Sequence, residues 1–199
     1  MNGDIWRNRI SNRIDLVARL THLTRGDSDE DAFEILWKIL NEKKLKGSGN
    51  SGYVVGTKKA VCFQEVPLYS IVENLLYEES LEGKNRYSWF GLRFNKIRMS
   101  QKGARPVIYG KTDELKTILP PTEHWRIVKL DLDAEEKVDW THEREWRICG
   151  DFSFEYNDIE ILVKDDTYYK MFVEKCIDER KLELLKSIHG IVPLNTVIS

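Results

Sequence analysis

Apolar residues recur along the chain in short groups, and their spacing changes between that of a helix and that of a strand. The clearest helical group follows Ser28 and consists of Phe33, Leu36, Trp37 and Leu40. Ser28, with Asp31 three residues later, resembles a capping box, which places the start of this helix. We expect the helix to continue into the lysines at 43–46 and to end at the glycine-rich segment 47–52.

Further helices are predicted in three places. Pro67 suits the first turn of a helix that runs to about Tyr77. Its buried stripe is expected to consist of Ile71, Val72, Leu75 and Leu76. Thr112 can cap a short helix. Residues 167–187 form a charged amphipathic stretch, with a break near Ile177.

The remaining apolar segments are short, and we predict them as strands. They cover residues 16–21, 60–63, 89–94, 106–109, 125–132, 145–148, 159–163 and 191–198. These strands alternate with helices in no regular βαβ order, and the Gly-x-Gly-x-x-Gly and P-loop patterns are absent. The sequence therefore predicts an α+β fold in a single domain of residues 1–199, with no Rossmann or Walker nucleotide site.

The composition is that of a globular protein of 199 residues, with 41% hydrophobic and 32% charged residues. No apolar run approaches the roughly 18 residues that span a bilayer, and the first residues lack the apolar centre of a signal peptide. The three widely spaced cysteines form neither a metal pattern nor a disulfide framework. We expect a cytoplasmic protein with reduced thiols and no membrane partner.

The cations are concentrated in residues 84–111, which contain no Asp or Glu. This segment carries +8, which against a total of −2 leaves −10 on the rest of the chain. Aromatic residues lie among the cations, a combination that suits phosphate contact and base stacking in single-stranded DNA or RNA, or the pyrophosphate of a dinucleotide. The candidate nucleic-acid contacts are Arg93, Lys96, Arg98, Lys102 and Arg105. The alternative is a strand pair with aromatic residues in the core and cations in solvent.

A second candidate is the sequence Thr-His-Leu-Thr-Arg-Gly at 21–26. On a strand, His22 and Thr24 point to the same face, because side chains alternate. An imidazole beside a hydroxyl can donate to and accept from a sugar diol or a carboxamide. A histidine that forms a local hydrogen bond at the end of a strand would give the same pattern.

The third candidate, Trp-Thr-His-Glu-Arg-Glu-Trp-Arg at 140–147, combines dense charge with tryptophan. If the strand at 145–148 extends back to Glu143, then Glu143 and Glu145 share one of its faces. A carboxylate at a strand end, near an aromatic ring, can stabilise an oxocarbenium ion that develops at a sugar C1. Plain surface charges, with both tryptophans in the core, are the alternative.

The order of these motifs resembles two groups of bacterial proteins. Residues 20–24, followed by a helix, a glycine-rich turn and Val-Cys-Phe-Gln-Glu-Val-Pro at 61–67, look like the opening of DarT-like ADP-ribosyltransferases. Residues 87–96, residues 103–109 and the Glu-Arg-Glu-Trp-Arg sequence resemble the AbiGi-type abortive-infection family. The resemblance implies an ADP-ribosyltransferase-like fold, with a split antiparallel or mixed sheet and flanking helices.

The resemblance also implies a site for NAD, which these enzymes use as a substrate. His22 would match the histidine that contacts NAD, Thr24 the hydroxyl two residues on, and Arg25 a contact to the NAD phosphates. The family's aromatic motif around nicotinamide has no obvious match in this chain. Phe63 and Tyr69 are the candidates for it.

Among the acidic residues, the resemblance matches Glu145 to the catalytic glutamate and Glu143 to a residue that orients the acceptor. We therefore expect an NAD-dependent mono-ADP-ribosyltransferase or NAD glycohydrolase of toxin–antitoxin or phage-defence type, with DNA, RNA, protein or water as acceptor. The alternative is a non-catalytic antitoxin or abortive-infection module that binds nucleic acid or a cognate toxin or antitoxin through residues 84–111. A metal-dependent nuclease that uses His142 with both glutamates lacks a third acidic ligand at a recognisable spacing.

Overall fold

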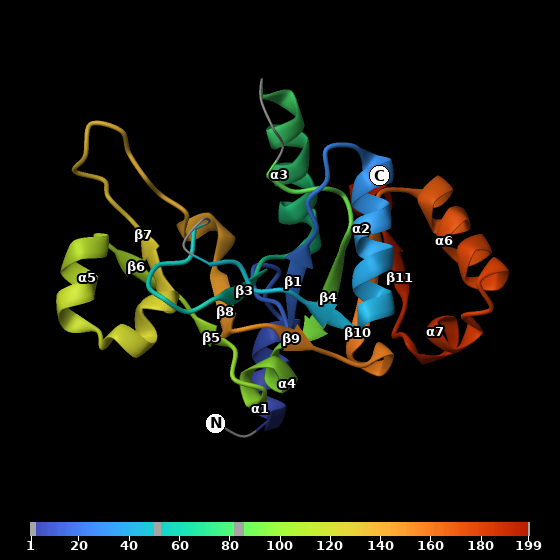
Figure 1. Ribbon diagram of the computed structural model, residues 1–199, viewed down its shortest axis with the longest axis horizontal. Coiled ribbons are helices and arrows are strands. Elements are labelled where there is room, and N and C mark those ends of the chain that lie inside the picture. The colour runs from blue at the N-terminus through green and yellow to red at the C-terminus, as the bar shows by residue number, and fades with distance from the viewer. Residues whose placement is uncertain (1–2, 50–52, 82–85, 199) are drawn as a thin grey trace. The chain divides into compact units, whose positions relative to one another are not determined.

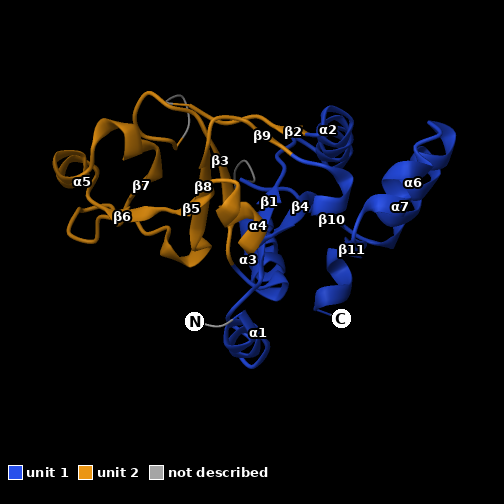
Figure 2. Ribbon diagram, turned by 90° about the horizontal axis from the view of Figure 1, so that it is seen from below, with its two compact units in different colours: residues 1–43, 66–95, 154–199 blue, residues 44–65, 96–153 orange. Residues whose placement is uncertain are grey.

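The computed structural model describes residues 3–49, 53–81 and 86–198 (Figure 1). The chain divides into two compact units, which Figure 2 draws in different colours. Unit 1 comprises residues 1–43, 66–95 and 154–199, and unit 2 comprises residues 44–65 and 96–153. Both units combine strands with helices, which confirms the predicted α+β class. In the described ranges, no helix is both long and apolar enough to cross a membrane.

Unit 1 contains a mixed set of strands in the order β11-β10-β4-β1, in which β10 and β11 are parallel and the other neighbours antiparallel. The strands are β1 (Arg19–Leu23), β4 (Gly91–Asn95), β10 (Ile159–Val163) and β11 (Ile191–Pro193). The helices are α1 (Gly3–Ser11), α2 (Asp29–Glu42), α3 (Leu68–Ser80), α6 (Asp166–Asp178) and α7 (Leu182–Ser187). Two 3₁₀ turns complete the unit, η3 (Tyr156–Asp158) and η4 (Leu194–Val197).

The core of unit 1 is aromatic and joins α2 to α6. The ring of Phe33 on α2 lies 5.9 Å from Phe90 and 5.6 Å from Tyr168, measured between ring centroids. One turn further along α2, Trp37 meets Phe172 edge to face at 5.5 Å. These contacts account for the helical spacing of the apolar residues in α2, since that stripe is the buried face of the helix.

Unit 2 is built from shorter strands. An antiparallel group has the order β3-β8-β5, while β2 pairs antiparallel with β9 and β6 pairs parallel with β7. The strands are β2 (Lys44–Leu45), β3 (Ala60–Gln64), β5 (Arg105–Pro106), β6 (Ile108–Gly110), β7 (Ile127–Lys129), β8 (Glu145–Cys149) and β9 (Phe152–Ser153). The helical segments are α4 (Lys96–Gln101), α5 (Thr112–Ile118), η1 (Pro121–Arg126) and η2 (Thr141–Glu143).

Several predicted limits are wrong. Helix α2 starts as predicted, with the Ser28 hydroxyl accepting from Asp31 N–H, but it ends at Glu42 because Lys43 is left-handed (φ 47°). The lysines that follow therefore leave the helix, and the predicted loop at 50–52 lies outside the described residues. In α3, Leu76 is exposed rather than part of the buried stripe.

The strand predictions fail where a helical turn replaces part of the segment. The segment predicted as strand at 125–132 is strand only over Ile127–Lys129, and η1 occupies the residues before it. The predicted last strand, 191–198, ends at Pro193, and η4 follows. The predicted strand at 106–109 is divided, since the chain leaves β8 after Val107 and pairs with β7 instead.

Candidate functional site

Glu145 begins strand β8, and its carboxylate forms a buried ion pair with Arg147 two residues along the same strand. Arg147 Nε donates to Glu145 Oε1 at 2.7 Å, and Nη2 donates to Oε2 at 3.3 Å. The two side chains are 8% and 1% exposed. The guanidinium also donates to the backbone carbonyls of Trp125, Ile127 and Tyr53. These bonds fix the direction of the Glu145 carboxylate.

Two further titratable groups surround this ion pair. Cys62 lies directly opposite Arg147 in the β3–β8 register, and the phenol oxygen of Tyr109 accepts from the N–H of Glu145 at 2.9 Å. Burial raises the pKa of the Cys62 thiol, and the charge of Glu145 adds to the effect. Burial also raises the pKa of Tyr109 to about 12. Burial alone would lower the pKa of Arg147, but the Glu145 carboxylate raises it, so the guanidinium stays charged at neutral pH.

Glu143 is separated from β8 by a change of backbone direction. It ends the turn η2, and Arg144 after it adopts a left-handed conformation with φ 47°. The strand therefore does not extend back to Glu143, and the condition under which the two glutamates would share a strand face is not met. The half-buried Glu143 still belongs to the same electrostatic neighbourhood, because its charge raises the pKa of both Cys62 and Tyr109.

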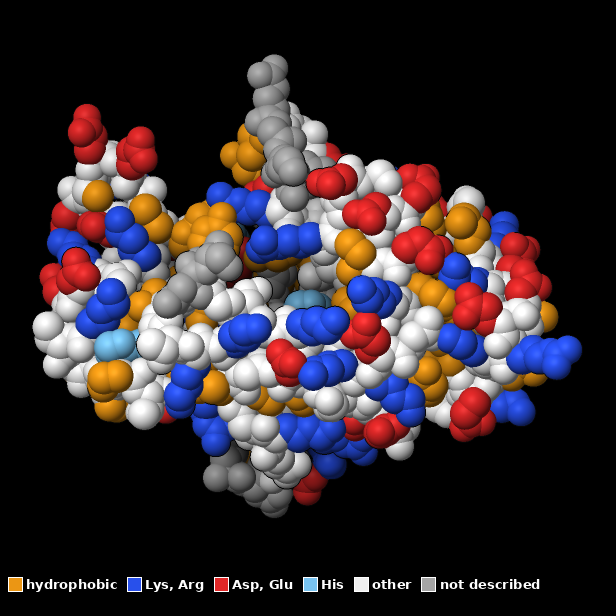
Figure 3. Space-filling model, viewed as in Figure 1, with side chains coloured by type: hydrophobic (Ala, Val, Ile, Leu, Met, Phe, Trp, Pro, Cys, Tyr) orange, Lys and Arg blue, Asp and Glu red, His pale blue; other side chains and the backbone are white. Residues whose placement is uncertain are grey.

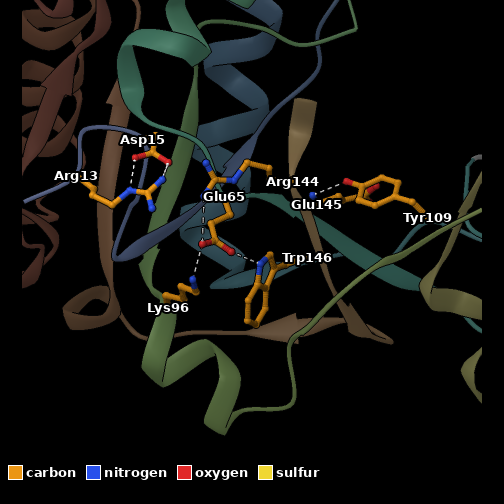
Figure 4. A network of polar contacts seen from close by, with 8 residues as sticks. All are labelled: Arg13, Asp15, Glu65, Lys96, Tyr109, Arg144, Glu145 and Trp146. Carbon is orange, nitrogen blue, oxygen red and sulfur yellow. Dashed lines mark hydrogen bonds and ion pairs between the residues drawn. The ribbon is translucent and has the colours of Figure 1, made fainter. Parts of the chain in front are cut away.

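A second carboxylate, Glu65, holds the chain on both sides of Glu145 (Figure 4). It follows β3, accepts from Trp146 Nε1 at 2.5 Å and from Lys96 Nζ, and lies 3.7 Å from Arg144 Nη2. The N–H of Glu65 donates to the Arg144 carbonyl at 3.3 Å. Glu65 is not among the residues predicted for the site. The feature of the sequence that could have indicated it is its position directly after a predicted strand, in the Gln-Glu-Val-Pro motif.

The basic segment 84–111 is divided between the two units, and much of its charge is paired with acids from elsewhere in the chain. The ion pairs join Arg93 to Glu160 in unit 1, and Lys96 to Glu65 and Lys111 to Asp133 in unit 2. Arg105 donates to the carbonyls of Ser100 and Ala104. Arg98, Lys102 and Arg105 are exposed, and Lys84 lies outside the described residues.

Charge mixing extends to other surfaces. Figure 3 shows Asp and Glu side chains among Lys and Arg over α6 and α7. In that part of unit 1, Lys175 pairs with Glu34 and Glu179, and Lys181 also pairs with Glu179. Opposite charges are therefore interspersed in this part of unit 1.

The predicted NAD contacts in unit 1 differ in exposure. His22 is half-buried on β1, opposite Leu92. The Thr24 hydroxyl is buried, with the Ser88 hydroxyl at 2.8 Å and the Phe90 carbonyl at 3.1 Å. Arg25 is exposed, with its guanidinium 5.8 Å from the centroid of the Tyr87 ring. Thr24 thus ties the end of β1 to the segment before β4.

The two candidates for the nicotinamide contact lie in different surroundings. Tyr69 is 41% exposed on α3 of unit 1. Phe63 is 1% exposed on β3 of unit 2, and its ring packs edge to face against Phe152. Phe63 therefore belongs to the core of unit 2. Glu143 and Glu145 belong to unit 2, whereas His22, Thr24 and Arg25 belong to unit 1.

The three thiols should differ sharply in reactivity. Cys149 is exposed, whereas burial raises the pKa of Cys176 to about 11 and also raises that of Cys62. Because the thiolate is the reactive form, a chromogenic disulfide reagent at pH 8 should label Cys149 rapidly and the other two only after unfolding in urea. The control is Cys149→Ser, which should remove the rapid phase. A second rapid thiol in that variant would contradict the buried environment of Cys62 or Cys176.

In comparisons with known proteins, no family model matches the chain, and no curated protein or solved structure matches it significantly. Among the residues that the structure describes, no three His, Cys, Asp or Glu side chains are grouped so that they could hold a metal ion.

Proposed function

We propose that this protein is an NAD-dependent mono-ADP-ribosyltransferase, with an ADP-ribosyltransferase-like fold and Glu145 as the catalytic carboxylate. The observation that carries the proposal is the bidentate ion pair between Glu145 and Arg147. A carboxylate that stabilises positive charge must be ionised and must keep one orientation while the bond breaks. Arg147 meets both needs, because its guanidinium is always charged and binds both carboxylate oxygens.

The ion pair leaves Glu145 with capacity to accept a further hydrogen bond. A carboxylate offers about four lone-pair sites, of which Arg147 takes two. A remaining site would accept from the ribose 2′-hydroxyl of NAD. The negative charge of Glu145 then stabilises the positive charge that develops at the ribose C1 as nicotinamide leaves. Glu143, on the turn before β8, would orient the acceptor.

A second candidate function is a non-catalytic module on the same fold, which binds nucleic acid or a cognate toxin or antitoxin. Two observations favour it. Arg147 neutralises much of the charge of Glu145, and the Thr24 hydroxyl is fully engaged within unit 1. In this reading Arg98, Lys102 and Arg105 of unit 2 contact the partner, since they are exposed.

The two functions are separated by the fate of NAD. Incubation with NAD that is labelled in the nicotinamide should release labelled free nicotinamide. In a second experiment, NAD that is labelled in the ADP-ribose should transfer the label to an added acceptor (DNA, RNA or protein). The matched control is NADH, whose neutral dihydronicotinamide is a poor leaving group. Release in water alone would identify a glycohydrolase. No release with any acceptor, together with binding of a single-stranded oligonucleotide that weakens steeply between about 50 and 200 mM salt, would contradict the transferase and favour the binding module.

A further inference from the structure

Three charged side chains converge on one face of the strands of unit 1, and the proposed chemistry uses none of them. They are Arg19 on β1, Arg93 on β4 and Glu160 on β10. Arg93 lies directly opposite Glu160 in the pairing of β4 with β10, and directly opposite Thr21 in the pairing of β4 with β1. Because Thr21 and Arg19 are two residues apart on β1, all three charged side chains point to the same face.

The charges in this group do not balance. Glu160 Oε1 accepts from Arg19 Nη2 at 2.7 Å, and Glu160 Oε2 accepts from Arg93 Nη1 at 2.8 Å. One carboxylate thus serves two guanidinium groups, which leaves a net charge of +1. The side chains are only 27%, 16% and 15% exposed for Arg19, Arg93 and Glu160. Burial lowers the pKa of Arg93, and the neighbouring charge of Arg19 acts in the same direction.

The hydrogen bonds are incomplete as well. Arg19 Nη1 and Arg93 Nε are buried, and neither has an acceptor within the described part of the chain. Such donors are rare in native proteins, because a buried N–H without an acceptor loses its bond to water and gains nothing in exchange. An anion with several oxygens would accept from both guanidinium groups and would also balance the surplus charge.

We infer that the Arg19–Glu160–Arg93 group binds a small phosphate, as inorganic phosphate or as the terminal phosphate of a small metabolite. A tetrahedral oxyanion presents oxygens to two guanidinium groups at once, whereas the two oxygens of Glu160 are already engaged. The low exposure of the three side chains favours a small ligand over a nucleic-acid backbone. This site does not depend on NAD chemistry, because it uses different residues.

Titration calorimetry with inorganic phosphate tests the site. The ionic strength is held constant with chloride, and chloride alone serves as the reference titrant. The wild type should show saturable binding. Arg93→Lys should weaken it by about tenfold or more, because lysine keeps the charge but lacks the planar fork. Glu160→Gln should tighten it by about tenfold, because the competing carboxylate is removed. The matched control is Arg13→Gln, which removes an arginine that pairs with Asp15 at the surface of the same unit and should leave binding unchanged.

The same probe with pyrophosphate distinguishes the two sources. Tighter binding of pyrophosphate than of orthophosphate would identify the terminal phosphate of a metabolite, and the reverse would identify free phosphate. Circular dichroism shows whether each variant is folded. If Arg93→Lys is not folded, the phosphate affinity of Glu160→Gln decides the test alone. The inference is overturned if the wild type shows no saturable binding, or if folded Glu160→Gln and Arg93→Lys bind phosphate as the wild type does.

Discussion

Replacement of Arg147 by methionine should lower the free energy of unfolding by about 3–5 kcal/mol, as expected when one partner of a buried ion pair is removed. The buried Glu145 side chain would then be left without its partner. The backbone carbonyls of Trp125, Ile127 and Tyr53 would lose their donor as well. Urea denaturation followed by tryptophan fluorescence measures the change.

The double variant Glu145→Gln/Arg147→Met tests whether the loss comes from the unpaired charge. It should recover much of the stability, because a neutral pair of similar volume avoids the cost of burying two ions. The matched control is Lys170→Met, which removes the cation of an exposed pair with Asp166 and should change stability by less than about 0.5 kcal/mol. If the single and double variants lose the same amount, the packing of the Arg147 side chain is responsible rather than the charge of Glu145.

The elements predicted correctly are those whose signals lie close together in the sequence. Strand β10 occupies the predicted residues 159–163, because a run of β-branched and apolar side chains fills a central position in unit 1. The start of α2 is set by the N-cap Ser28, whose side chain accepts from the N–H of Asp31 three residues later. The break between α6 and α7 also lies close to its predicted position. Local patterns of this kind need no knowledge of distant contacts.

The errors arise where one residue adopts an uncommon backbone conformation or where a distant segment decides the structure. Lys43 and Arg144 adopt a left-handed backbone conformation although neither is glycine. Their residue types therefore do not predict this conformation. Arg144 alone turns Glu143 away from the strand that Glu145 begins. Helix α4 was missed because its six residues are too few to show a helical period.

The chemistry at the candidate site was partly predictable. The density of charge in residues 140–147 drew attention to Glu145, and the structure buries that side chain with Arg147, next to the half-buried Cys62 and Tyr109. The sequence could not show that three cations of the basic run 84–111 form ion pairs with acids outside it. The pairing of Arg93 with Glu160 spans 67 residues, and only the strand order brings the two together.

Nicotinamide release should fall by about 10²–10³-fold in Glu145→Gln, the loss expected when a group that stabilises transition-state charge is removed. The affinity for NAD should change little, because the carboxylate acts mainly as positive charge develops at C1. The glutamine amide is similar in size and can still accept a hydrogen bond from Arg147. Steady-state kinetics of nicotinamide release should therefore show the loss in kcat, with KM nearly unchanged.

The double variant separates this catalytic effect from the structural one. If the charge of Glu145 is needed for chemistry, Glu145→Gln/Arg147→Met should be folded and remain inactive, because it restores stability without restoring a carboxylate. If Glu145 only pairs with Arg147, the folded double variant should release nicotinamide at nearly the wild-type rate, which would refute its catalytic role. Glu143→Gln is the matched comparison, since it removes a carboxylate on the neighbouring turn. It should reduce transfer to the acceptor more than hydrolysis of NAD, because Glu143 is proposed to orient the acceptor rather than to stabilise the charge at C1.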